Sequence, residues 1–352
     1  MESNLAELRE RIVAARAAGK PLRLRGGGSK DFYGEALAGE VLDTRGHAGV
    51  VDYEPTELVI TERCGTPLSQ VENALAERDQ FLAFEPPAFG GVPTIGGVIA
   101  SGLSGPRRAT AGAARDFVLG AQLLNAEGNL LRFGGRVMKN VAGFDVSRLL
   151  CGSLGVLGLI AEVSLKVLPL PRAEATLCFD LNAAAAIEQF NRWCAQPLPV
   201  SATAWHAGRA YLRLSGAASA VRAACTALGG EALEPASAES WWRSMREQSH
   251  PVFQEAPRLW RLSLPSNAPL ALDGVVLIEW GGALRWSTTM AAAAQVRNAA
   301  AAAGGTATLW RGARDAPMFH PLAAPVLDLH RKLKQQFDPH GIFNPGRLVA
   351  GL

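Results

Sequence analysis

The sequence predicts an α+β protein with two domains, and three observations support this fold class. At 352 residues the chain is longer than a single hydrophobic core usually grows, so two domains are expected. Short apolar strands alternate with helical patterns as far as residue 168, where Pro169 and Pro171 end the last strand. Beyond the prolines, alanine-rich helices alternate with isolated strands. We therefore expect a helix in residues 1–19, one domain over residues 20–172, a smaller α+β domain over residues 173–320, and a C-terminal helix and tail in residues 321–352.

The individual elements follow from hydrophobic spacing and from residues that end helices and strands. Leu5, Leu8 and Ile12 recur at helical spacing, with Asn4 as an expected cap and Gly19 as the stop. A second helix is expected to open at Thr66-Pro67, a capping residue followed by proline. Further helices are expected at residues 183–193, 217–228, 289–303 and 326–337. Strands are expected at residues 22–25, 58–61, 81–84, 117–125, 129–133, 161–168, 210–214, 259–264 and 275–280.

Composition excludes several classes of protein. The chain has 48% hydrophobic and 19% charged residues and a net charge of +3, with Lys and Arg spread along it, so nothing indicates a nucleic-acid partner. Its five cysteines include no C-x-x-C pair, which argues against a disulfide framework, a structural zinc site and an iron–sulfur cluster. The N-terminus lacks a signal-peptide pattern, and no apolar run is long enough to span a membrane. A cytoplasmic protein is expected, with any membrane contact made through a partner.

Three glycine-dense segments carry the functional signal, at residues 25–30, 94–108 and 151–158. Glycine lets main-chain N–H groups approach an anion without a Cβ in the way, so such turns can cradle phosphate. The first segment, Gly26-Gly27-Gly28-Ser29, matches neither G-x-G-x-x-G nor a Walker A motif, which disfavours a nicotinamide-binding Rossmann domain. Taken alone, the first segment is more typical of a hairpin turn. The second adds hydroxyls and a cation, and together the three predict a fold around a large phosphorylated cofactor.

The stretch from Glu85 to Gly112 consists almost entirely of glycine, proline, serine and other small residues. Such a composition cannot form a core, so the sequence predicts a long loop without secondary structure. Loops of this length inside a compact domain are usually functional.

Several of these segments match motifs of a known family. They are Arg25-Gly26-Gly27-Gly28-Ser29, Glu85-Pro86-Pro87, Thr94-Ile95-Gly96-Gly97, Gly112-Ala113-Ala114-Arg115-Asp116, Lys139-Asn140-Val141-Ala142-Gly143-Phe144-Asp145 and Ile342-Phe343-Asn344-Pro345-Gly346-Arg347. From end to end the chain resembles the FAD-binding flavoproteins of the vanillyl-alcohol oxidase and MurB-like (PCMH) type, and within them the E subunits of bacterial glycolate oxidases. The stretch from Lys139 to Asp145 looks peculiar to the glycolate oxidase subunits.

The resemblance implies a PCMH-type FAD domain of two subdomains, a cap domain, and a C-terminal tail that returns to the flavin. It also implies the residues that bind FAD. These are Arg25, Gly26, Gly27, Gly28, Ser29, Pro87, Thr94, Ile95, Gly96, Gly97, Ser101, Gly102, Ser104, Gly105, Arg107, Asp116, Gly155, Gly158, Ile160 and Asn344. The covalent flavoenzymes of the family carry a histidine in or near the first loop. This sequence has none there, so FAD is expected to be bound non-covalently.

The second domain departs from the family. Related 2-hydroxyacid dehydrogenases share a motif of the form H-x-x-G-D-G-N-x-H, and the corresponding region here, Glu279 to Trp286, contains no histidine. No metal site is therefore predicted. Arg285 is left as a weak candidate for binding a substrate carboxylate, and no catalytic residue can be named. The isolated histidines His206, His250, His320 and His330 are interpreted as surface residues without a metal-binding role.

These implications lead to a functional hypothesis: the chain is the FAD-carrying subunit of a glycolate oxidase, oxidising small 2-hydroxy acids. FAD can accept a hydride and release electrons singly, but this sequence has no cluster ligands to carry them further. A sister FAD subunit and an iron–sulfur subunit are the implied partners, with peripheral attachment to the inner membrane face through the complex as an option. Two alternatives stay open at this point, a self-sufficient FAD-dependent dehydrogenase and a non-catalytic relay or scaffold subunit.

Overall fold

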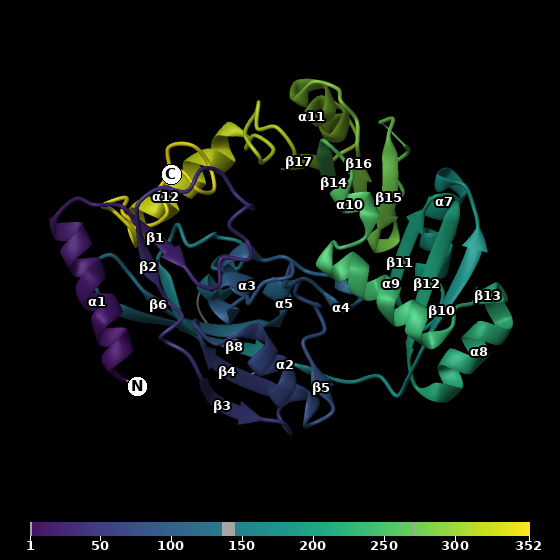
Figure 1. Cartoon of the computed structure of the whole chain (residues 1–352), viewed down its shortest axis with the longest axis horizontal. Coiled ribbons are helices and arrows are strands. Elements are labelled where there is room, and N and C mark those ends of the chain that lie inside the picture. The colour runs from purple at the N-terminus through teal and green to yellow at the C-terminus, as the bar shows by residue number, and fades with distance from the viewer. Residues whose placement is uncertain (1, 136–144, 271) are drawn as a thin grey trace. The chain divides into compact units, whose positions relative to one another are not determined.

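The computed structural model describes residues 2–135, 145–270 and 272–352, and these form two compact units (Figure 1). Unit 1 comprises Met1–Leu103, Ala113–Pro169 and Pro321–Leu352. Unit 2 comprises Ser104–Gly112 and Leu170–His320. The residues from Lys139 to Phe144 lie outside the described residues.

Unit 1 is built on a five-stranded antiparallel sheet of order β3-β4-β8-β6-β7. The strands of this sheet are β3 (Val50–Glu54), β4 (Val59–Arg63), β6 (Val118–Leu124), β7 (Leu130–Gly134) and β8 (Leu159–Lys166). Two small pairs accompany it: parallel β1 (Leu22–Arg25) with β2 (Glu40–Asp43), and antiparallel β5 (Gln80–Phe81) with β9 (Leu168–Pro169). Its helices are α1 (Glu2–Ala17), α2 (Leu68–Ala76), α3 (Ile95–Ser101), α5 (Ala114–Phe117), α6 (Val146–Leu149) and α12 (Ala324–Phe337).

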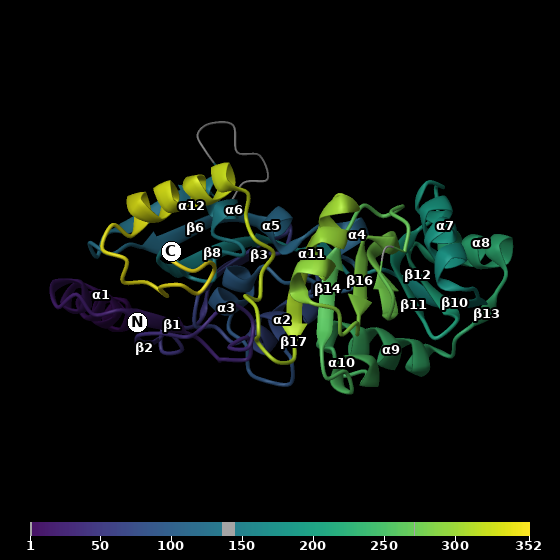
Figure 2. The ribbon, with the colours of Figure 1, turned by 90° about the horizontal axis from the view of Figure 1, so that it is seen from above.

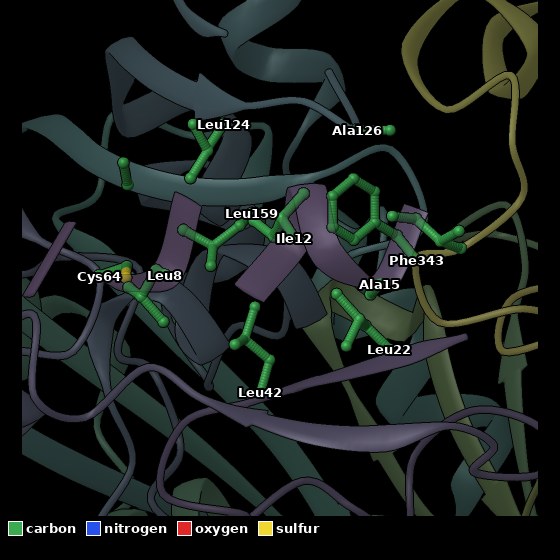
Figure 3. Close-up of a cluster of buried hydrophobic side chains, with 12 residues drawn as sticks. Leu8, Ile12, Ala15, Leu22, Leu42, Cys64, Leu124, Ala126, Leu159 and Phe343 are labelled. Atoms are coloured by element: carbon green, nitrogen blue, oxygen red, sulfur yellow. The ribbon is translucent and has the colours of Figure 1, made fainter. Parts of the chain in front are cut away.

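Helix α1 joins the parallel strand pair to the rest of unit 1 through a buried apolar cluster (Figure 3). Leu8 and Ile12 of α1 pack in this cluster with Leu22 of β1 and Leu42 of β2. Phe343 reaches the same cluster from the C-terminal tail, where it forms a parallel bridge with Leu22. The tail therefore closes the core of the unit that contains the N-terminal helix.

Two helix starts differ from the sequence prediction. Helix α1 begins at Glu2, so Asn4 lies within its first turn, and the Asn4 amide instead donates to the carbonyl of Gly46. Helix α2 begins at Leu68, with Pro67 as its N-cap. The hydroxyl of Thr66 donates to the Arg63 carbonyl at 2.7 Å and accepts from the Gly49 N–H at 2.9 Å. In both cases the side chain that was expected to cap the helix forms its hydrogen bonds with main-chain groups outside that helix.

The stretch predicted as a structureless loop contains a helix, α3. Its buried residues Ile95, Val98 and Ile99 are each fully enclosed, and Gly96 and Gly97 lie on its first turn. Two glycines lower intrinsic helix propensity by about 1 kcal/mol each relative to alanine. Burial of the apolar side overrides that preference, which composition alone could not show.

Unit 2 is an eight-stranded sheet of order β13-β10-β12-β11-β15-β16-β14-β17, antiparallel throughout its described strands (Figure 2). The strands are β10 (Ala173–Asp180), β11 (Val200–His206), β12 (Arg209–Gly216), β13 (Glu231–Ala232), β14 (Leu259–Ser263), β15 (Val275–Glu279), β16 (Leu284–Ser287) and β17 (Thr306–Arg311). The helices are α4 (Arg108–Ala111), α7 (Ala183–Cys194), α8 (Ala218–Leu228), α9 (Pro235–Glu247), α10 (Pro251–Gln254), the 3-10 turn η1 (Trp280–Gly282) and α11 (Ala293–Ala302).

Helices cover both faces of this sheet. Helices α7 and α8 pack on Leu177 of β10, and α11 packs on Leu262 of β14. On the opposite face, Trp242 of α9 donates its indole N–H to the hydroxyl of Thr176, and Phe253 of α10 lies edge-on against Trp286. Neighbouring strand residues point to opposite faces, so Thr176 and Leu177 mark the two sides.

Candidate functional site

An open cavity lies within unit 1. It is bounded by β1 and the loop after it, by α3, by the segment that leads into β8, and by the C-terminal tail. The residues that line it are Leu24, Arg25, Gly26, Gly27, Gly28, Ser29, Lys30, Asp31, Tyr33, Leu37, Thr44, Cys64, Pro93, Thr94, Gly96, Gly97, Ala100, Ser101, Leu154, Gly155, Gly158, Leu159, Ile160, Asn344 and Arg347.

The cavity brings together most of the residues that the resemblance implies for FAD, although they come from four separate parts of the sequence. Those that line it are Arg25, Gly26, Gly27, Gly28, Ser29, Thr94, Gly96, Gly97, Ser101, Gly155, Gly158, Ile160 and Asn344. All three glycine-dense segments therefore contribute to one wall or another.

The remaining residues of that set lie elsewhere. Ile95 is fully buried on the inner side of α3, and Gly102 ends the same helix in a left-handed conformation. Pro87 is buried outside the lining, and Asp116 accepts the Ala113 N–H at 2.8 Å to cap α5.

Ser104, Gly105 and Arg107 belong to unit 2. Arg107 forms an ion pair with Glu174 of β10, and the Gly105 carbonyl accepts the indole N–H of Trp280 at 3.1 Å. The second glycine-dense segment is thus divided between the two units, and its part after Leu103 does not line the cavity.

Glycine allows the walls of the cavity to come close at two points. A Cβ on Gly26 would lie 2.1 Å from Thr94 Oγ1, and a Cβ on Gly96 would lie 2.7 Å from the Cβ of Cys64. Both distances are far below van der Waals contact, so any larger residue would displace its neighbour. Gly26 therefore sets how closely the loop after β1 approaches the start of α3, and Gly96 sets how closely α3 approaches the residue after β4.

Thr94 supplies a test of whether a polar ligand fits this cavity. The residue is 3% exposed, lines the cavity, and its Oγ1 has no hydrogen-bond partner within the described protein. A buried hydroxyl without a partner costs about 1–3 kcal/mol, so such groups normally have one. An acceptor-rich ligand such as a phosphate or sugar chain would provide it, and the donor set therefore fits FAD.

The C-terminal tail fixes two walls of the cavity. The Asn344 side chain accepts the Leu24 N–H at 2.7 Å and donates to the Leu154 carbonyl at 2.6 Å. The Arg347 guanidinium donates to the main-chain carbonyls of the loop after β1, including that of Asp31 at 2.8 Å. The tail positions both the first and the third glycine-dense segments.

A buried ion pair holds the tail in turn. Lys334 of α12 donates from Nζ to Asp338 Oδ2 at 2.6 Å, to the Val156 carbonyl at 2.7 Å and to the Phe343 carbonyl at 2.8 Å. Burial lowers the pKa of Lys334, while Asp338 opposes that shift. Because three acceptors surround the ammonium group, this contact links α12, the tail and the segment before β8.

The charged residues of the cavity are mainly basic. Arg25, Lys30 and Arg347 line it together with the single carboxylate Asp31. Asp31 is shared by Arg25 and Arg23, at 2.9 and 2.5 Å. Sequence reasoning missed Lys30, Asp31 and Arg347, although Arg347 stands three residues after Asn344 in a motif already singled out. The basic excess favours an anionic ligand.

Cys64 is the cavity residue that could be suspected of covalent chemistry. Burial raises the pKa of its thiol to about 12. The thiolate is the nucleophilic form, so at neutral pH this cysteine is unreactive. No histidine is among the lining residues, and all five cysteines are free.

Comparison with known proteins identifies the family. The glycolate oxidase subunit GlcE of Escherichia coli (strain K12) is 46% identical over 346 residues, covering 98% of this chain and 97% of that protein. The chain belongs to the GlcE family of glycolate oxidase subunits. A model described as an FAD binding domain matches residues 3–134, which include the first two glycine-dense segments up to Arg108. The chain is therefore a flavoprotein, as its sequence motifs predicted.

More distant relatives share only part of the chain. The glycolate oxidase subunit GlcD of Bacillus subtilis (strain 168) is 32% identical over 128 residues, which is 36% of this chain and 27% of that protein. A D-lactate dehydrogenase of Archaeoglobus fulgidus is 28% identical over 174 residues, 47% of this chain and 38% of that protein. Both relatives are thus named for the oxidation of a hydroxy acid, glycolate in one and D-lactate in the other.

A solved structure described as alkyldihydroxyacetonephosphate synthase has the same fold. It superposes with a TM-score of 0.66 and covers 97% of this chain and 76% of that chain, at 16% sequence identity. The predicted α+β architecture of PCMH type is confirmed by this likeness and by the FAD binding domain.

The described residues offer neither a metal-binding cluster nor a membrane-spanning helix. In residues 2–135, 145–270 and 272–352, no group of three or more His, Cys, Asp or Glu side chains is placed to hold a metal ion. Among the helices of the same residues, none has the length and apolarity needed to cross a membrane.

Arg285, the weak candidate for substrate binding, lies in the core of unit 2. It is 1% exposed, and its guanidinium donates to the carbonyls of Gly282 at 3.0 Å, Pro269 at 2.7 Å and Ala268. Burial lowers its pKa. These bonds tie η1 to the loop after β14, which is a structural role.

Proposed function

We propose that this chain is the FAD-binding subunit of a glycolate oxidase complex that oxidises glycolate and related 2-hydroxy acids to 2-oxo acids. The observation that carries the proposal is the 46% identity to GlcE over 98% of the chain. Partial similarity to hydroxy-acid dehydrogenases supports the same substrate class. The basic, glycine-lined cavity of unit 1 supports the cofactor.

The main-chain N–H groups of Gly26 to Ser29 and the hydroxyl of Thr94 would hold the pyrophosphate and ribityl parts of FAD. Arg25 and Lys30 would supply positive charge, and Asn344 would keep the facing walls in place. Bound FAD supplies a hydride acceptor that can release its electrons one at a time. We propose that it is held without a covalent bond, since Cys64 is protonated and the lining contains no histidine.

Electron transfer calls for partners. A two-electron oxidation must pass its electrons onward, and the described residues contain no cluster of metal-ligating side chains to receive them. We propose a sister FAD subunit and an iron–sulfur subunit as the neighbours in the complex. Five free cysteines fit a reducing cytoplasm, and any attachment to the membrane surface would then be made by the complex.

One observation favours a second candidate function, a relay or scaffold subunit that binds FAD without oxidising substrate. The segment from Glu279 to Trp286 contains no histidine, and Arg285 within it is used for packing. Both functions would use the same FAD cavity in unit 1. Whether the chain also oxidises substrate would depend on residues of unit 2.

The deciding experiment is an anaerobic visible spectrum of the purified chain, recorded before and after glycolate and again after the sister flavoprotein is added. Bleaching of the flavin band by glycolate alone would show an active subunit. Bleaching that requires the partner would show a relay subunit. Absence of a flavin band after reconstitution with FAD would contradict the cofactor site itself.

A further inference from the structure

The cavity of unit 1 contains a carboxylate, although its proposed ligand is an anion. Among the described residues that line it, Asp31 is the one acidic side chain. FAD carries a pyrophosphate, and a negative charge in the same cavity repels it. The contacts of Asp31 point to a use other than direct contact with the ligand.

The Asp31 carboxylate joins two arginines of β1. Its Oδ2 accepts from Arg23 Nη2 at 2.5 Å and from Arg25 Nε at 2.9 Å. Alternate residues of a strand point to the same side, so these two guanidiniums are neighbours and their charges repel each other. The carboxylate compensates both charges and accepts a hydrogen bond from each. It therefore limits where the two long side chains can lie.

One of these two arginines belongs to the cavity. Arg25 lines it, whereas Arg23 is not among the lining residues. While Nε of Arg25 is bonded to Asp31, its Nη2 lies so close to Gly28 that a Cβ on Gly28 would be 2.1 Å from it. Gly28 belongs to the loop whose main-chain N–H groups we propose for the pyrophosphate, and its φ of +74° is one that favours glycine. The Asp31 contact thus places a cation beside these N–H groups.

The C-terminal tail holds Asp31 in turn. Residues 26–39 contain no helix or strand, so contacts with other segments set the shape of this loop. The Asp31 N–H donates to the Gly28 carbonyl at 3.0 Å, and the Asp31 carbonyl accepts from Arg347 Nη2 at 2.8 Å. The Arg347 guanidinium also donates to two further carbonyls of the loop. One guanidinium from the tail therefore holds the loop that carries Asp31.

We propose that Asp31 is a positioning residue for the cofactor: it holds the Arg25 guanidinium beside Gly28, where the guanidinium binds a phosphate of FAD. Arg347 acts one step earlier, by holding the main chain at Asp31. This proposal rests on the proposed function, which assigns FAD to the cavity of unit 1. It accounts for a carboxylate in a basic cavity, since the carboxylate contacts the arginines and not the ligand.

Asp31→Asn gives opposite results for a positioning role and for a purely electrostatic one. If Asp31 acts only through its charge, the variant has a more positive cavity and binds FAD more tightly. If Asp31 positions Arg25, the variant loses a charge-assisted hydrogen bond, and the Kd for FAD should rise about tenfold. The Kd is measured by flavin fluorescence during titration of the apoprotein.

Asp43→Asn is the matched control. Asp43 pairs with Arg25 in the register of β1 and β2, but it forms its ion pair with Arg45. The control therefore removes a negative charge near the same arginine without removing the contact that positions it. We expect no rise in the Kd for FAD.

A double-mutant cycle tests whether Asp31 acts through Arg25. Arg25→Gln alone should raise the Kd for FAD about tenfold to a hundredfold, because a phosphate loses its cation. With Arg25→Gln already present, Asp31→Asn should have no further effect, because the side chain that it positions is gone. Two independent effects would instead multiply.

Hydrogen exchange of the apoprotein tests the part assigned to Arg347 without any ligand. Arg347→Gln removes the donors of three carbonyls in the loop, so the amides of residues 31–35 should exchange about tenfold faster than in the wild type. The amides of β8, the central strand of the sheet in unit 1, should keep their wild-type rates.

Circular dichroism checks that each variant is folded. If Asp31→Asn is unfolded, Asp31→Glu takes its place. The longer side chain keeps the charge but displaces the carboxylate from the two arginines. A positioning role therefore still predicts a higher Kd for FAD, whereas a purely electrostatic role predicts no change.

The outcomes separate the positioning role from the function. Wild-type or tighter FAD binding in folded Asp31→Asn would overturn the positioning role, and so would effects of Asp31→Asn and Arg25→Gln that multiply. Unchanged exchange of residues 31–35 in Arg347→Gln would overturn the part assigned to the tail. A wild-type chain that binds FAD but is not reduced by glycolate, alone or in its complex, would overturn the proposed substrate and leave these FAD affinities unaffected.

Discussion

The two units arrange their polar groups in opposite ways. The cavity of unit 1 is built largely of main chain, with glycines at the close approaches to Thr94 and Cys64 and with the tail bonding to carbonyls and N–H groups. A cluster of unit 2 is built of side chains, in which Arg108 and Arg261 meet on the indole of Trp280. A main-chain site constrains residue type locally and leaves a pattern in the sequence. A cluster of side chains depends on which segments become neighbours, and it leaves no such pattern.

The units also differ in how they bury charge. Arg285 of unit 2 is surrounded by carbonyls that accept its N–H groups. Glu62 of unit 1 is fully buried on β4, and neither carboxyl oxygen has a hydrogen-bond partner in the described protein. Burial raises the pKa of Glu62 to about 8, so at neutral pH this carboxyl holds its proton. Hydrogen bonds stabilise the buried charge of the Arg285 guanidinium, whereas the buried Glu62 carboxyl keeps its proton and is neutral.

The largest effect is expected from Arg285→Gln. The change removes a buried cation and leaves three carbonyls without their donor, so unfolding free energy should fall by about 4 kcal/mol in urea titrations. Glycolate affinity of the folded variant should stay at the wild-type value, and Arg222→Gln, at an exposed residue of α8, is the control. A stable variant with weakened glycolate binding would instead place Arg285 in the substrate site.

Glu62→Gln tests the protonated carboxyl. The folded pKa of about 8 exceeds the unfolded value of 4.5, so the wild type holds more protons when folded and loses stability as pH rises toward 8. Between pH 5.5 and 8.5 the loss should be about 3 kcal/mol. The variant cannot titrate there, so its unfolding free energy should depend less on pH by that amount. Equal pH dependence in chemical denaturation of both proteins would contradict a protonated Glu62.

Gly26→Ala tests whether the unit 1 site depends on close main-chain approach. The new Cβ would lie 2.1 Å from Thr94 Oγ1, so β1 and α3 must separate. FAD affinity, measured by flavin fluorescence during titration of the apoprotein, should fall roughly a hundredfold, or about 2.7 kcal/mol. Gly46→Ala is the matched control because its nearest neighbour would be 3.5 Å away. Unchanged FAD affinity in Gly26→Ala would show that the loop after β1 and the start of α3 can move apart without loss of FAD binding free energy.

Thr94→Val should have the smallest effect, with opposite signs on stability and affinity. Valine keeps the shape but removes a buried hydroxyl that has no protein partner, so the apoprotein should gain about 1 kcal/mol. FAD affinity should drop about tenfold, because the ligand loses a hydrogen bond. Thermal unfolding of the apoprotein and the same FAD titration measure the two effects. A loss of apoprotein stability would mean that the hydroxyl has a partner within the protein.

Most elements could be predicted from sequence because their signals are local. The helices at α7, α8 and α12 and the strands β6, β7 and β8 lie within a few residues of their predicted bounds. Helix α3 was missed because its stability comes from burying Ile95, Val98 and Ile99, not from the propensity of its glycines. The cap of α2 was misassigned because Thr66 bonds to Arg63 and Gly49 instead.

The sequence by itself determined the fold class, the family and the glycine-dense segments, since each depends on residue types at short spacing. Only the tertiary structure decided that residues 104–112 join unit 2, that Arg347 holds the loop after β1, and that Arg285 is buried while Arg261 stacks beside Arg108. The physical reason is the range of the interactions. Backbone conformation is set by a residue and its neighbours, whereas the partner of a long polar side chain is set by packing between segments hundreds of residues apart.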